Sequence, residues 1–89
     1  MSNYTIKITK ISNYVGSNDT ENFKKGKITK QEYEYSYIDF GEALEEYKNK
    51  CKESANSICV GVCFFENHTI QLIRNIDNQI DLHFNCNNL

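Results

Sequence analysis

The sequence predicts an α+β fold in which one antiparallel sheet of about five strands carries a single helix on one face. Three observations predict it. Several segments alternate apolar and polar residues with a period of two, as strands do, and one segment has apolar residues at helical spacing. Short polar stretches separate the last three expected strands, which favours an antiparallel meander. The expected order is two strands, one helix and three strands.

The size and composition of the chain fit one folded domain covering residues 1–89. Hydrophobic residues make up 39% and charged residues 25% of the sequence, which is typical of a globular protein. No apolar run approaches the roughly 18 residues that a membrane-spanning helix needs, and the N-terminal residues do not resemble a signal peptide. We therefore expect a cytoplasmic protein with no membrane partner.

Two strands are expected before the helix. Residues 3–11, NYTIKITKI, alternate well, and residues 12–20 are rich in Ser, Asn, Asp and Gly and predict a loop. The second strand runs from about residue 28 to residue 37. Its tyrosines share one face, which we expect to be buried, and its charged residues point the other way: Tyr33, Tyr35 and Tyr37 against Glu32 and Glu34.

Residues 39–55 predict the helix. Asp39 is a suitable N-cap, and Glu42 three residues later completes a capping-box pattern. The apolar residues of this segment recur at helical spacing and define the face that should contact the sheet. They are Phe40, Ala43, Leu44, Tyr47, Cys51 and, at the end, Ala55.

The last three strands are expected at residues 57–65, 69–76 and 79–86, with turns at 66–68 and 77–78. Ile73 and Ile76 break the strict alternation, which indicates a bulge or a strand end. Under the helix we expect the apolar set Tyr4, Ile6, Ile8, Ile70, Leu72, Ile80, Leu82 and Phe84. The opposite face should carry Thr5, Lys7, Thr9, Glu32, Glu34, Gln71, Asp81 and His83.

The strand expected at residues 57–65 is apolar or small on both faces, which is typical of a strand covered on both sides. One helix can cover only one of them. Cys59, Gly61, Cys63 and Phe65 should therefore lie on the face away from the helix. Either neighbouring side chains and loop 12–27 cover this strip, or it forms a contact with a partner or with a second copy of the chain.

The sequence favours neither catalysis nor metal binding. Cys59 and Cys63 would lie about 13 Å apart along a strand, too far for one zinc ion or for a disulfide. A cysteine–histidine pair with His68 or His83 would lack an orienting third group. We therefore predict a non-enzymatic protein with no catalytic residues, no metal site and no cofactor.

Charge is distributed unevenly along the chain. Residues 1–30 carry six lysines and two acidic residues, whereas residues 31–89 carry four basic and ten acidic residues. Lys24, Lys25, Lys27 and Lys30 form a basic cluster just before the tyrosines. Basic and aromatic side chains together can bind single-stranded nucleic acid. The expected burial of the tyrosines and the acidic Glu32 and Glu34 argue against direct binding here.

The strand-to-helix passage YSYIDFGEALEEY at residues 35–47 is of a kind common in small α+β proteins. The chain resembles the small phage-encoded anti-CRISPR proteins in size and in its single-domain organisation. Its richness in Asn, Ile and Lys is typical of AT-rich coding sequences, such as those of low-GC bacteria and their phages. The resemblance implies a non-enzymatic inhibitor, acting in the host bacterial cytoplasm, that binds a CRISPR effector and blocks nucleic-acid access or assembly. It assigns no residue a role.

The expected function is therefore binding to a protein partner. The alternative is a homodimeric accessory protein or a single-stranded nucleic-acid-binding module. The candidate contact residues are the basic cluster, the charged positions facing away from the helix and one exposed aromatic. They are Lys24, Lys25, Lys27, Lys30, Glu32, Glu34, Asp81, His83 and Phe65.

Overall fold

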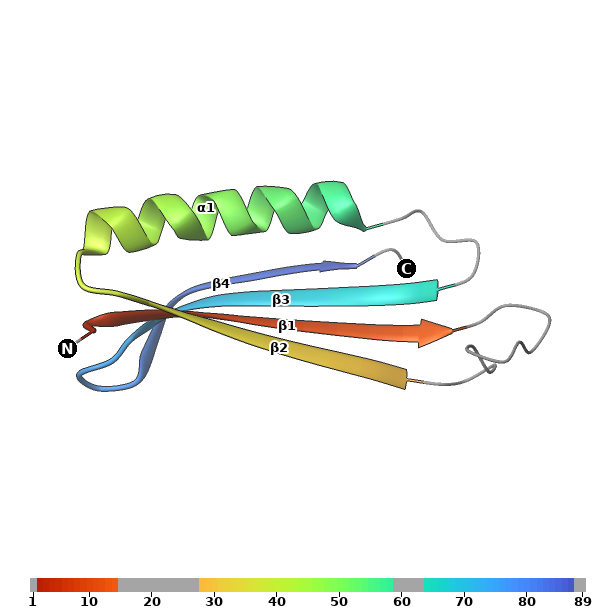
Figure 1. Cartoon of the computed structure of the whole chain (residues 1–89), viewed down its shortest axis with the longest axis horizontal. Coiled ribbons are helices and arrows are strands. Elements are labelled where there is room, and N and C mark those ends of the chain that lie inside the picture. The colour runs from red at the N-terminus through yellow and green to blue at the C-terminus, as the bar shows by residue number, and fades with distance from the viewer. Residues whose placement is uncertain (1, 15–27, 59–63, 88–89) are drawn as a thin grey trace.

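The computed structural model describes residues 2–14, 28–58 and 64–87. They form one four-stranded antiparallel sheet and one helix, in the order β1 (Tyr4–Tyr14), β2 (Ile28–Tyr37), α1 (Phe40–Ser57), β3 (Phe64–Arg74) and β4 (Gln79–Asn87). The strands lie side by side as β2-β1-β3-β4, and α1 packs along one face of the sheet (Figure 1). The predicted α+β class, with one antiparallel sheet and one helix on one face, is confirmed.

The expectation of about five strands is wrong for the part of the chain described here, because β3 runs without a break through the expected turn at residues 66–68. Ser12, Ile11 and Lys10 of β1 pair with Glu66, Asn67 and His68 in turn. Pairing with a strand distant in sequence satisfies the backbone of these polar residues. Ser57, expected in a strand, ends α1, and Phe64 and Phe65 begin β3. Residues 59–63 of the expected strand lie outside the described residues.

The break in alternation near Ile73 indicated a bulge or a strand end, but β3 continues through Ile73 to Arg74 in unbroken register with β1, and the bulge lies opposite it in β4. Leu72 pairs with Leu82 and Ile73 pairs with Ile80, so that Asp81 of β4 is the extra residue between the two pairs. The bulge shifts Ile80 opposite Ile73, which shares the face of Thr5. The expectation that Ile80 points toward the helix is therefore wrong.

The core lies between α1 and the two central strands. Ile6 and Ile8 of β1 and Ile70 and Leu72 of β3 are buried, and Ala43 and Tyr47 of α1 pack onto them. The helix begins where predicted, because the Asp39 carboxylate accepts a hydrogen bond of 3.0 Å from the backbone N–H of Glu42. At the C-terminal end of the helix, Ala55 was expected to face the sheet. Instead Ser54 is buried and Ala55 is exposed.

The helix covers the two edges of the sheet only in part. A helix is about 10 Å wide and neighbouring strands are about 4.8 Å apart, so one helix covers roughly two strands. Those two are β1 and β3. Leu82 of β4 and Tyr33 and Tyr35 of β2 point toward the helix side and remain exposed. The expectation that all three tyrosines belong to the core is therefore wrong for Tyr33 and Tyr35, whereas Tyr37 packs against the core.

The face of the sheet opposite α1, here called the outer face, is not covered by any of the described elements (Figure 1). Its polar side chains bond to one another across strands. Asn85 of β4, for example, donates to Asn67 at 2.9 Å and to Thr69 at 3.2 Å. Within the described ranges, no helix is long and apolar enough to cross a membrane.

Candidate binding surfaces

The expected contact residues of β2 line one edge of the outer face. Lys30, Glu32 and Glu34 are exposed, and the ammonium group of Lys30 lies 3.1 Å from a carboxylate oxygen of Glu32. This contact lowers the pKa of Glu32, first through the hydrogen bond and then through the charge of Lys30. Lys24, Lys25 and Lys27 lie outside the described residues. The expected basic cluster is thus represented here by Lys30, which is paired with an acid.

The remaining expected contact residues lie elsewhere on the sheet. His83 is exposed on β4, with its Nδ1 3.4 Å from the amide nitrogen of Gln71, and Asp81 occupies the bulge of the same strand. Phe65 lies at the far end of β3, opposite Asn13, and is 45% exposed. β1 and β3 separate β4 from β2. The structure therefore does not bring the expected residues that it describes together into one site.

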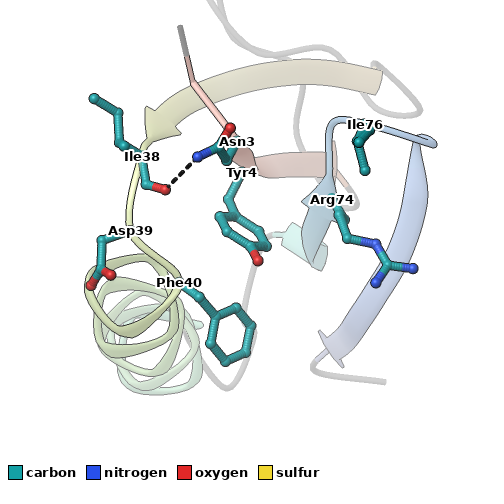
Figure 2. A pocket seen from close by; sticks show the side chains of 7 residues that line it. All are labelled: Asn3, Tyr4, Ile38, Asp39, Phe40, Arg74 and Ile76. Atoms are coloured by element: carbon teal, nitrogen blue, oxygen red, sulfur yellow. Dashed lines mark hydrogen bonds between the residues drawn. The ribbon is translucent and has the colours of Figure 1, made fainter.

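A different surface has the features of a binding site. At the end of the sheet where β2 passes into α1, seven residues line a hollow of about 340 Å³ that we call the end pocket (Figure 2). They come from the start of β1, from the β2–α1 connection and the start of α1, and from the end of β3 and the β3–β4 turn. They are Asn3, Tyr4, Ile38, Asp39, Phe40, Arg74 and Ile76. The rings of Tyr4 and Phe40 pack 5.3 Å apart between their centroids.

The walls of the end pocket are held by hydrogen bonds. The side-chain amide of Asn3 donates to the backbone carbonyl of Ile38 at 3.0 Å (Figure 2), and the backbone N–H of Asn75 donates to the carbonyl of Asn3 at 2.9 Å. These bonds tie the β2–α1 connection and the β3–β4 turn to the residues before β1. The pocket is therefore a preformed part of the fold.

The end pocket exposes large apolar side chains that contribute little to the core. Ile76 is 90% and Ile38 is 67% exposed. Arg74 lies beside them, and its guanidinium donates to Asp77 at 3.0 Å and to Gln79 at 2.7 Å. Its contact with Asp77 raises the pKa of Arg74 and lowers that of Asp77. Apolar anchors, aromatic rings and a positioned arginine are typical of protein–protein contacts.

The sequence analysis did not identify the end pocket, although a signal for it was present. Ile38 and Ile76 lie in connections between elements, outside the alternation of any strand and outside the apolar face of the helix. Connections are usually polar, so Ile38 is informative, whereas residue 76 falls inside the strand expected at residues 69–76 and gives no such signal. The missing information was that the two connections lie at the same end of the sheet.

A second hollow, of about 340 Å³, lies between the C-terminal half of α1 and β2. Lys50 places its ammonium group 4.9 Å from the ring centre of Tyr35, and Lys10 lies 5.7 Å from that of Tyr33. These are cation–π contacts. Glu53 also lines the hollow and pairs with Lys50 at 3.7 Å. The cations are thus already engaged by rings and a carboxylate, which does not favour nucleic acid here.

Within the described ranges, no cluster of three His, Cys, Asp or Glu side chains could hold a metal ion. Cys59 and Cys63 lie outside those ranges. Cys51 and Cys86 are half-buried, and burial raises the pKa of both thiols. A thiol with a raised pKa stays protonated at neutral pH and is a poor nucleophile.

His68 is a buried polar side chain within the sheet. It faces the helix side of β3, opposite Lys10 and Cys86, and its Nδ1 has no hydrogen-bond partner. Burial lowers the pKa of His68, and the charge of Lys10 adds to this effect, whereas Glu66 acts in the opposite sense. The neutral imidazole is therefore the form that the folded state favours.

We expect the free energy of unfolding to fall as the pH drops below the unfolded-state pKa of histidine, about 6.5. The unfolded chain then binds a proton that folded His68 does not, and the lost stability grows as the pH falls toward the lowered folded-state pKa. Urea midpoints at pH 7.5, 6.5 and 5.5 measure this. In His68→Leu the midpoint should fall less over this range, whereas the exposed control His83→Gln should follow the wild type. An equal fall in His68→Leu would contradict the assignment.

Neither a protein-family model, nor a curated protein, nor a solved structure matches the chain.

Proposed function

We propose that this chain is a small non-enzymatic binding protein that docks a protein partner against the end pocket. The observation that carries the proposal is the gathering of exposed apolar side chains, Ile38, Phe40 and Ile76, around one preformed hollow. Removing such side chains from water stabilises a complex by about 25 cal/mol for each Å² buried. The fixed guanidinium of Arg74 at the pocket supplies an oriented polar contact.

The most concrete form of this function is inhibition of a bacterial defence effector in the cytoplasm of the host. The chain resembles anti-CRISPR proteins in size and single-domain organisation, and a protein of this kind acts by occupying a surface. Docking through one end would leave the rest of the elongated domain, which extends 47 × 20 × 17 Å, to obstruct the path of a nucleic acid or of another subunit. No chemical step is required.

A plasmid-interference assay tests this form. Bacteria that carry one of a panel of CRISPR effectors receive a targeted plasmid, with or without the chain expressed. The wild-type chain should preserve the plasmid against at least one effector. The variant Ile38→Asp/Ile76→Asp should lose this protection, because it places charges on the proposed contact while changing two exposed side chains that the fold does not need.

Phe65→Asp is the matched control, because it also introduces a charge at an exposed apolar residue, at the far end of the sheet. Phe65 was one of the contact residues expected from the sequence, so the pair of variants distinguishes the two surfaces. Protection that survives in Ile38→Asp/Ile76→Asp and fails in Phe65→Asp would assign the contact to the outer face. Absence of protection against every effector would overturn the inhibitor proposal.

A further inference from the structure

The two edges of the sheet differ in their readiness to pair with another strand. β4 carries the bulge at Asp81, which interrupts a regular edge. β2 pairs with β1 in an unbroken register from Ile28 to Tyr37, and every β2 residue before Tyr37 is exposed. Among the described elements no strand lies beyond β2, so β2 is a long, regular edge of the described sheet, and such an edge is a template for strand addition.

We propose that β2 pairs antiparallel with β2 of a second copy of this chain, in the register that places Gln31 opposite the partner's Gln31. The charges of β2 select this register. On the outer face it puts Lys30 opposite the partner's Glu32, and by symmetry Glu32 opposite the partner's Lys30. Opposite charges in directly facing positions stabilise an antiparallel pair.

The neighbouring symmetric registers bring like charges together. If the two-fold axis passes through Lys30, the two copies of Lys30 face each other. If it passes through Glu32 or Glu34, two glutamates face each other. A centre on Tyr33 sets Glu32 opposite the partner's Glu34 on both sides of the axis. Like charges in directly facing positions are destabilising. Among these registers, only the one centred on Gln31 places opposite charges in facing positions and places no like charges in facing positions.

This pairing also accounts for the exposed tyrosines of β2. A two-fold axis perpendicular to the sheet keeps both helices on the same side of the joined sheet. In each copy Tyr33 and Tyr35 remain partly exposed on the helix side, so the tyrosines of both copies would lie in the space between the two helices. Tyr33 would face the partner's Thr29, and aromatic residues pair favourably with β-branched residues across strands.

The pairing leaves the end pocket free. Ile38 follows the C-terminal end of β2, and antiparallel strands point in opposite directions, so that the two end pockets lie at opposite ends of the dimer. The inference is therefore independent of the proposed function, and either can fail alone.

A symmetric cysteine tests the register. Cα atoms of directly facing residues in antiparallel strands lie about 4.5–5.5 Å apart, within the range that a disulfide spans. Gln31→Cys should therefore form a covalent dimer under mild oxidation, and mass spectrometry should identify a peptide linked to its own copy through the introduced thiol. Thr29→Cys is the matched control on the same face and strand, and it should not link to itself because it faces the partner's Tyr33. Equal self-linkage at both positions, or none at Gln31→Cys, would overturn the register.

Charge reversal tests the pairing itself. Light scattering after size exclusion, over a concentration series with reductant, should give a mass approaching twice 10.4 kDa for the wild type. Lys30→Glu and Glu32→Lys should each raise the dissociation constant about tenfold or more, because two facing pairs become repulsive. The double variant Lys30→Glu/Glu32→Lys should restore the dissociation constant of the wild type.

The contact between Lys30 and Glu32 within one chain is exposed, so the single variants should melt like the wild type at dilutions where each is monomeric. A wild-type monomer at every concentration overturns the proposal. A double variant as weak as the single variants overturns the Gln31 register.

Discussion

Leu72→Ala is expected to lower the free energy of unfolding by about 2–5 kcal/mol, enough to leave a domain of this size largely unfolded under mild denaturing conditions. Leu72 lies at the centre of the sheet. It pairs with Ile6 on one side and Leu82 on the other, and its side chain is fully buried. Truncation therefore leaves a cavity in a core that consists of few residues and cannot collapse around it.

Leu82→Ala provides the control, because it removes the same atoms at the facing position of the adjacent edge strand. Leu82 is 37% exposed, so we expect it to cost less than half as much. Urea denaturation followed by far-UV circular dichroism measures both variants. Equal losses would mean that the helix covers β4 as fully as β3, which would contradict the packing described here.

The second large effect is expected at the helix. Ala43→Glu should prevent stable folding, because Ala43 is fully buried against the sheet and a carboxylate there would be desolvated in a space that fits one methyl group. Ala55→Glu places the same side chain on the same helix at an exposed position. It should change the free energy of unfolding by no more than about 0.5 kcal/mol.

The two alanine variants also test which way the end of the helix faces. The sequence pattern placed Ala55 with Ala43 on the apolar face, whereas the structure buries Ser54 and exposes Ala55. Thermal melting monitored by helical circular dichroism decides the point. Comparable destabilisation by Ala55→Glu and Ala43→Glu would favour the face drawn from the sequence over the one in the structure.

Local patterns predicted the local features of this fold. The Asp39 cap, the spacing of Ala43 and Tyr47, and the alternation of Ile6 and Ile8 each depend on residues a few positions apart. The turn expected at residues 66–68 is wrong, because the conformation of these residues depends on contacts distant in the sequence. These three residues have turn-like side chains, but their conformation is determined by pairing with residues 10–12 of β1, far away in the sequence.

The exposure of the edge tyrosines could not be predicted from alternation. Alternation gives the face on which Tyr33 and Tyr35 lie, but not whether anything covers that face. Coverage depends on strand order, which places β2 at the edge, where the helix covers it only in part. The same gap in information explains why Lys30 and His83 were expected in one contact surface, although they lie on opposite edges.

The candidate site was the least predictable part. The outward orientation of Glu32, Glu34 and His83 agrees with the expectation, since all three are exposed away from the core. The end pocket, however, is assembled from three stretches that lie far apart in the sequence. Only the isoleucine at position 38, in the expected connection before the helix, pointed toward it.

The central claim is that the end pocket is the partner-binding surface. The most direct measurement is a calorimetric titration of the purified chain into an effector against which it protects a plasmid in the interference assay, for wild type, Ile38→Asp/Ile76→Asp and Phe65→Asp. We predict that Ile38→Asp/Ile76→Asp raises the dissociation constant at least about thirtyfold, as expected when hot-spot contacts worth about 2 kcal/mol are lost. Phe65→Asp should have the wild-type dissociation constant. Unchanged affinity in Ile38→Asp/Ile76→Asp would contradict the claim.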